Sequence, residues 1–68
     1  MTKEMQFFIY LLEYYAAYKN QTTGDILTAW DNCGITNEIY DNYWLYHTER
    51  IENAYADIDN LMLKRMSS

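Results

Sequence analysis

The residues of this chain that could carry out chemistry are one cysteine, one histidine and two closely spaced aspartates. Cys33 and His47 are the only pair able to form a thiol–imidazole site, in which the imidazole takes the thiol proton and the thiolate attacks a substrate. Cys33 falls at the end of an expected helix, where the helix dipole disfavours a thiolate. We therefore expect Cys33 to be a small buried hydrophobic residue, and the protein not to be an enzyme.

His47 and the two aspartates do not form a metal site by spacing. With one histidine and one cysteine, only carboxylates remain to complete a coordination shell, and we expect His47 instead to make a hydrogen bond that fixes a corner between two helices. Asp57 and Asp59 flank the inward-pointing Ile58 and diverge on a helix, so we interpret them as part of a solvated face. The chain has no glycine-rich phosphate loop. We expect no metal and no cofactor.

Length and composition favour one small helical domain over residues 1–68. Half of the 68 residues are hydrophobic, yet a domain of this size buries only about 60% of the surface of its unfolded chain. The single cysteine rules out an internal disulfide and fits a reducing compartment. The apolar run at 5–12 is too short to span a bilayer. We expect a cytoplasmic protein without a membrane anchor.

Hydrophobic periodicity predicts four helices and no strand. They cover about residues 3–19, 22–33, 37–46 and 48–66. The first has an apolar arc broad enough to be covered on more than one side. The fourth repeats apolar residues at steps of three and four, through Ile51, Tyr55, Ile58, Met62 and Met66. The prediction is a compact all-α domain of four helices, in which the first and last pack along each other and a hairpin of the second and third lies across them.

Capping residues define the expected helix ends. Thr22 is the expected N-cap of the second helix, with Asp25 three residues later as in a capping box. Gly34 is expected to take the left-handed conformation that ends this helix. Thr36 and Thr48 are the expected N-caps of the third and fourth helices.

The second and third helices resemble a helix-turn-helix, but their charge opposes DNA binding. Residues 20–49 contain no lysine or arginine and five acids interleaved with aromatic residues. The helix that would read DNA presents Glu38 and Asp41 with no cation to meet a phosphate. Trp30 stands where close helix approach requires a small residue. We therefore expect no direct nucleic acid binding and interpret the motif as a helical hairpin with a glycine turn.

An acidic surface rich in aromatic residues predicts a protein-binding module with a basic protein as its partner. The candidate anchors are Trp44, Tyr40 and Tyr43, and the candidate residues for electrostatic steering are Asp31, Glu38 and Asp41. One alternative is an acidic inhibitor of a host defence protein, of the kind phages encode, that mimics nucleic acid. Another is a self-associating structural module, in which surplus aromatic side chains form a homodimer interface.

Three short patterns resemble a small bacterial family of unknown function, catalogued under the number 3791. They are the aromatic segment 7–14, the segment 23–27 leading to Cys33-Gly34-Ile35, and the ending at 46–48 followed by 57–59. Together they span nearly the whole chain; the chain departs from the family pattern after Thr48, where the family tends to have glycine. The resemblance implies a compact helical domain. It also implies an antitoxin-like or regulatory role. The genes of family members often lie beside a second small gene, and some of these neighbours encode proteins that look like ADP-ribosylating toxins.

Overall fold

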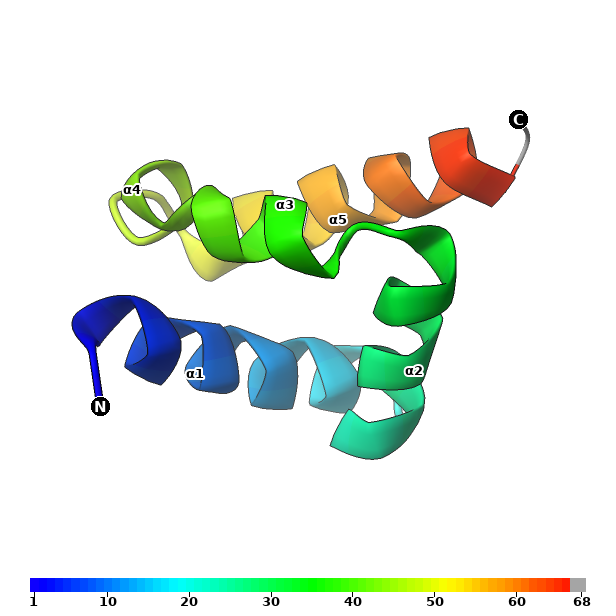
Figure 1. Ribbon diagram of the computed structural model, residues 1–68, viewed down its shortest axis with the longest axis horizontal. Helices are drawn as coiled ribbons and strands as arrows, with labels where there is room; N and C mark the ends of the chain where they lie inside the picture. Colours follow the sequence, from blue (N-terminus) through cyan, green and yellow to red (C-terminus); the bar gives the residue numbers. More distant parts are fainter. Residues whose placement is uncertain (67–68) are drawn as a thin grey trace.

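Five helices and no strand make up residues 1–66, the part of the chain that this computed structural model describes. The helices are α1 Lys3–Tyr18, α2 Thr23–Cys33, α3 Thr36–Asp41, α4 Tyr43–Tyr46 and α5 Ile51–Met66. Helices α1 and α5 run along the long axis, α2 stands across one end, and α3 leads back to α4 at the other end (Figure 1). The radius of gyration is 11.2 Å. The predicted all-α, compact fold is confirmed, with five helices in place of four.

Threonine caps and left-handed residues set the ends of the first two helices. Thr22 accepts a hydrogen bond from the backbone N–H of Asp25 at 3.1 Å, as the capping pattern predicts. Gly34 ends α2 in the left-handed region at φ 72°, also as predicted. Asn20 takes the same conformation after α1, at φ 57°. Helix α2 therefore lies between two left-handed residues, which turn the chain at both of its ends.

The predicted third helix is broken at Asn42, and the helix-turn-helix-like hairpin is correspondingly incomplete. Helix α3 ends at Asp41 after six residues. The Asn42 carbonyl then accepts the backbone N–H groups of Leu45 and Tyr46, which starts the single turn of α4. Asparagine is a weak helix former, which favours a break at this position. The Asn42 side chain makes no capping bond to the backbone, and its amide donates to the Tyr46 hydroxyl at 3.4 Å.

Two predicted caps are wrong. Thr36 is the first residue of α3, whose N-cap is Ile35, and its hydroxyl donates a hydrogen bond to the Asp31 carboxylate at 2.5 Å. Thr48 does not cap α5, which begins only at Ile51. Its hydroxyl donates instead to the Leu45 carbonyl at 2.9 Å and so closes the end of α4. Both hydroxyls bond backward along the chain, to groups that precede them.

The hydrophobic core forms around Trp30 at the junction of α1, α2 and α5. Trp30 is fully buried, and its ring centroid lies 5.8 Å from that of Phe8 and 5.5 Å from that of Tyr15. The predicted apolar stripe of α5 is buried at Ile58 but ends before Met66, which is 72% exposed. The buried set comprises Leu11, Leu12, Tyr15, Ala16, Ile26, Trp30, Ile35, Ile39, Tyr46, Ala54, Tyr55 and Ile58.

The two glycines of the chain provide a matched pair of substitutions. Gly34→Ala forces a Cβ into the left-handed region, so we expect the free energy of unfolding to fall by about 1 kcal/mol. Gly24→Ala adds the same methyl inside α2, where alanine is the better helix former, so we expect a gain of roughly 0.5 kcal/mol. Urea unfolding of both variants measures this difference, and a loss of equal size in both would contradict it.

Candidate functional site

The α4 turn, residues Tyr43–Tyr46, presents two large apolar side chains to solvent. Trp44 is 74% exposed and Leu45 is 50% exposed, whereas Tyr46 in the same turn is buried. Successive side chains of a helix point about 100° apart. In this single turn Tyr46 points into the core, and Trp44 and Leu45 lie on the outer side. An exposed tryptophan beside an exposed leucine is typical of a protein-binding surface.

The residues behind Trp44 hold it on an aromatic support. His47 stacks on Tyr43 with the ring centroids 4.2 Å apart and the planes 7° from parallel. The Trp44 ring lies 5.3 Å from each of these two rings, edge to face. Phe7 of α1 packs its ring against Tyr43 at 5.6 Å. Trp44 is thus presented by a packed cluster, which limits the conformational entropy lost on binding.

His47 makes a hydrogen bond, as the sequence predicts, but the bond lies within the α4 turn and does not join two helices. Its Nδ1 lies 2.7 Å from the backbone carbonyl of Tyr43, so the hydrogen bond places a proton on this nitrogen. Cys33 lies at the end of α2 and packs against the buried core. Cys33 therefore packs at the end of α2, and His47 packs at the end of α4. Within residues 1–66, no three histidine, cysteine, aspartate or glutamate side chains are grouped closely enough to hold a metal ion.

The other predicted anchors are more enclosed than Trp44. Tyr40 is half-buried, with its ring centroid 5.9 Å from that of Phe8. Tyr43 is also half-buried, because its ring lies between Phe7 and His47. Of the three predicted anchors, only Trp44 projects from the surface as a separate side chain.

Two of the three predicted steering acids have hydrogen-bond or ion-pair partners within the chain, and the third is exposed. Asp31 accepts the Thr36 hydroxyl. Glu38 forms an ion pair with Arg65 of α5, with 2.9 Å between the carboxylate oxygen and the guanidinium nitrogen. Asp41 is exposed at the end of α3, three residues before Trp44. The structure therefore leaves Asp41 exposed, whereas Asp31 and Glu38 already make intramolecular contacts.

The solvated face expected at Asp57 and Asp59 is wrong, because both carboxylates are half-buried acceptors for tyrosine hydroxyls. Tyr15 of α1 donates to Asp59 at 2.5 Å, and Tyr46 of α4 donates to Asp57. Burial, and then the bond to the carboxylate, raise the pKa of both tyrosines well above its ordinary value. The position of Ile58 could have indicated this, because the residues on either side of an inward-pointing residue lie at the edge of the core.

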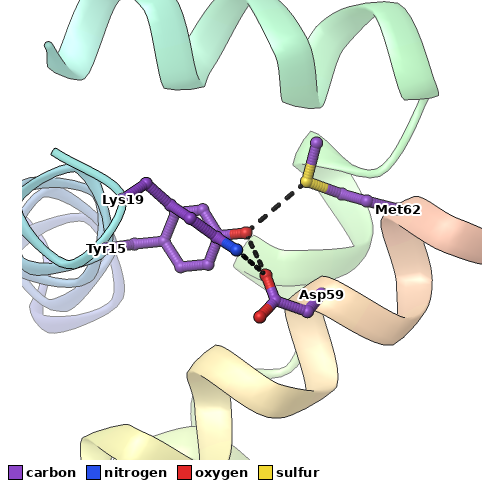
Figure 2. Close-up of polar contacts among 4 residues, drawn as sticks. All are labelled: Tyr15, Lys19, Asp59 and Met62. Carbon is purple, nitrogen blue, oxygen red and sulfur yellow. Dashed lines mark hydrogen bonds and ion pairs between the residues drawn. The ribbon is translucent and has the colours of Figure 1, made fainter. Parts of the chain in front are cut away.

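A second feature that the sequence did not predict is a hollow of about 480 Å³ between the end of α1, α2 and α5. Lys19 and Asp59 form an ion pair at 3.0 Å in its wall. Figure 2 shows Tyr15 and Lys19 reaching from α1 toward Asp59, with the Met62 sulfur on the other side of the Tyr15 hydroxyl. The lining residues are Tyr15, Lys19, Gln21, Ile26, Ala29, Asp59, Met62 and Leu63.

The fold and these surfaces define a small all-α domain with an outward-facing aromatic turn. The chain belongs to the family described as "Protein of unknown function (DUF3791)", whose model matches residues 6–65. No curated protein and no solved structure matches the chain. None of the helices within residues 1–66 is long and apolar enough to cross a membrane.

The two tyrosine–aspartate bonds predict a loss of stability in alkali. The ordinary tyrosine pKa is 10.0, and both folded values are raised, so the bonds contribute in full below pH 10.0. Above that pH the unfolded chain releases these protons while the folded chain keeps them, and the free energy of unfolding falls. We expect each tyrosine to contribute up to about 1.4 kcal/mol per pH unit there.

Urea unfolding at about pH 8 and about pH 11, on either side of the ordinary tyrosine pKa, measures this dependence. Phenylalanine has no proton to lose, so the double variant Tyr15→Phe, Tyr46→Phe should be less stable at the lower pH but lose less on going to the higher one. An unchanged pH dependence in the variant would show that these tyrosines are not its source.

Proposed function

We propose that this protein is a non-enzymatic module that binds another protein through Trp44 and Leu45 of the α4 turn. The observation that carries this proposal is the 74% exposure of Trp44 on a packed aromatic support. Tryptophan is among the residues most often found as the dominant contact of an interface. A side chain that is already oriented loses little freedom on binding. These properties support a role for Trp44 as the anchor.

The charge of the chain favours a basic partner in this proposal. The net charge is −5, and the exposed Asp41 precedes the anchor by three residues. Such charges speed up encounter with a basic surface and make the association rate depend on salt. In the version that the family resemblance favours, the partner is a second small protein, and the domain neutralises or regulates it as an antitoxin-like subunit in the cytoplasm.

Several of the ten acids have partners within the fold, which weighs against mimicry of nucleic acid at these positions. A mimic presents its carboxylates to solvent in place of phosphates. Here Glu38 is paired with Arg65, and Asp57 and Asp59 accept tyrosine hydroxyls. The exposed apolar side chains of the α4 turn are the stronger recognition feature.

Substitution of the anchor tests the proposal. The tagged wild type and Trp44→Ala are used to purify binding partners from the native organism, and quantitative mass spectrometry compares what each recovers. Loss of an anchor costs at least about 2 kcal/mol, which is roughly a 30-fold weaker Kd. Trp44 is exposed, so its substitution should leave stability almost unchanged. The matched control is Tyr14→Ala, which removes a half-exposed aromatic ring from α1.

The proposal requires a partner that the wild type and Tyr14→Ala recover in stoichiometric amounts and that Trp44→Ala does not. Equal recovery by Trp44→Ala would exclude the α4 turn as the binding surface. If the tagged wild type is purified with no other protein bound to it, the protein has no dedicated partner under these conditions and the proposal fails.

Electrostatic steering has a separate test once the partner is known. Asp41→Lys reverses the exposed charge near the anchor, so we expect the association rate to fall several-fold at low salt and the dissociation rate to change little. Asp25→Lys, at the first turn of α2, is the control for the same change of net charge. Stopped-flow or surface-binding kinetics at two salt concentrations separate the two effects. If Asp41→Lys behaves like Asp25→Lys, Asp41 has no specific steering role.

A further inference from the structure

The hollow between α1, α2 and α5 has the size and lining of a small-molecule site. Its volume of about 480 Å³ falls in the range found for ligand pockets. Ile26 and Ala29 of α2 form one wall, and Met62 and Leu63 of α5 form the other. The walls are aliphatic, and the thioether of Met62 adapts to different shapes. A ligand with an aliphatic part would bury that part against these side chains.

At one end of the hollow, the ammonium group of Lys19 lies among a carboxylate and two aromatic rings. The Lys19 ammonium lies 3.0 Å from an Asp59 carboxylate oxygen. It also lies 5.1 Å from the ring centroid of Tyr18 and 5.7 Å from that of Tyr15. A carboxylate and two aromatic rings within about 6 Å of a cation are the elements of an ammonium-recognition site. Figure 2 shows the lysine side chain lying across the Tyr15 ring to reach Asp59.

Lys19 holds this position weakly enough to be replaced. Its side chain is 38% exposed and that of Asp59 is 29% exposed, so water reaches the ion pair. An ion pair of this kind contributes little to stability. Asp59 stays in place without Lys19, because the Tyr15 hydroxyl also donates to it. Lys19 can therefore move into solvent while the carboxylate and the Tyr15 ring remain in position.

We infer that the hollow binds a small organic ammonium compound with an aliphatic tail, and that Lys19 competes with the ligand for Asp59. The ligand ammonium takes the place of the Lys19 ammonium at Asp59, and its tail lies along Ile26, Ala29 and Met62. The Asp59 charge and the net charge of −5 both oppose an anionic ligand. This inference does not depend on the α4 turn, which lies at the other end of the molecule (Figure 1).

Three probes with the same tail and different head groups test the charge preference. They are n-octylammonium, octanol and octanoate, each titrated into the wild type below its micelle concentration and followed by methyl chemical shifts. We expect n-octylammonium to bind about tenfold more tightly than octanol, and octanoate most weakly. The shifts should gather at Ile26, Ala29 and Met62. Equal affinities for the three probes, or shifts concentrated at Leu45, would overturn the inference.

Two substitutions test the competition with Lys19. Lys19→Met keeps an aliphatic side chain and empties the ammonium position, so the affinity for n-octylammonium should rise severalfold more than that for octanol. Asp59→Asn keeps an acceptor for Tyr15 and removes the charge, so the preference for n-octylammonium over octanol should disappear. Lys3→Met removes the same charge from the first turn of α1 and serves as the control. If Lys19→Met weakens n-octylammonium binding, Lys19 is not a competitor and the inference fails.

Discussion

The position of α5 depends on two tyrosine hydroxyls that donate to carboxylates on either side of Ile58. Asp57 and Asp59 are two residues apart, which on a helix corresponds to about 200° of rotation. One carboxylate therefore meets Tyr46 of α4 and the other meets Tyr15 of α1, while the fully buried Ile58 points into the core between them. A half-buried carboxylate is costly without a donor, so each pair favours one rotation and one register of α5.

The twelve aromatic residues of this small domain are accommodated partly in the core and partly by packing against one another at the surface. Four of their rings, those of Tyr15, Trp30, Tyr46 and Tyr55, lie in the buried core. On the surface of α1, exposed rings pack against other rings: Tyr10 against Tyr14 at 4.4 Å, and Tyr18 against the buried Tyr55 at 4.7 Å. Trp44 differs, because it contacts its support edge to face and remains mostly exposed. The number of exposed rings is thus less informative than their packing.

The sequence predicted features that depend on neighbouring residues and missed features that depend on distant ones. Thr22 and Gly34 were predicted because a cap and a left-handed turn are set within a few residues. The pairing of Glu38 with Arg65 joins residues 27 apart, and no local pattern reveals it. The break at Asn42 was missed because a helical period continued through it.

The candidate site shows the same division. Trp44 was chosen as an anchor because acids and aromatic residues are interleaved in this part of the sequence; its ring is exposed, and its role as an anchor stays a prediction. Tyr40 was chosen on the same grounds, yet it packs against Phe8 of α1, a contact set by the fold. The hollow at Lys19 and Asp59 needs α1, α2 and α5 together, so no segment of the sequence contains it.

The sequence separation of the two tyrosine–aspartate bonds has a consequence for the order of folding. Tyr46 and Asp57 are 11 residues apart, whereas Tyr15 and Asp59 are 44 apart. Closing the longer loop costs about 1.2 kcal/mol more in chain entropy. We therefore expect α4 and α5 to join first and the pair to dock on α1 as a later step.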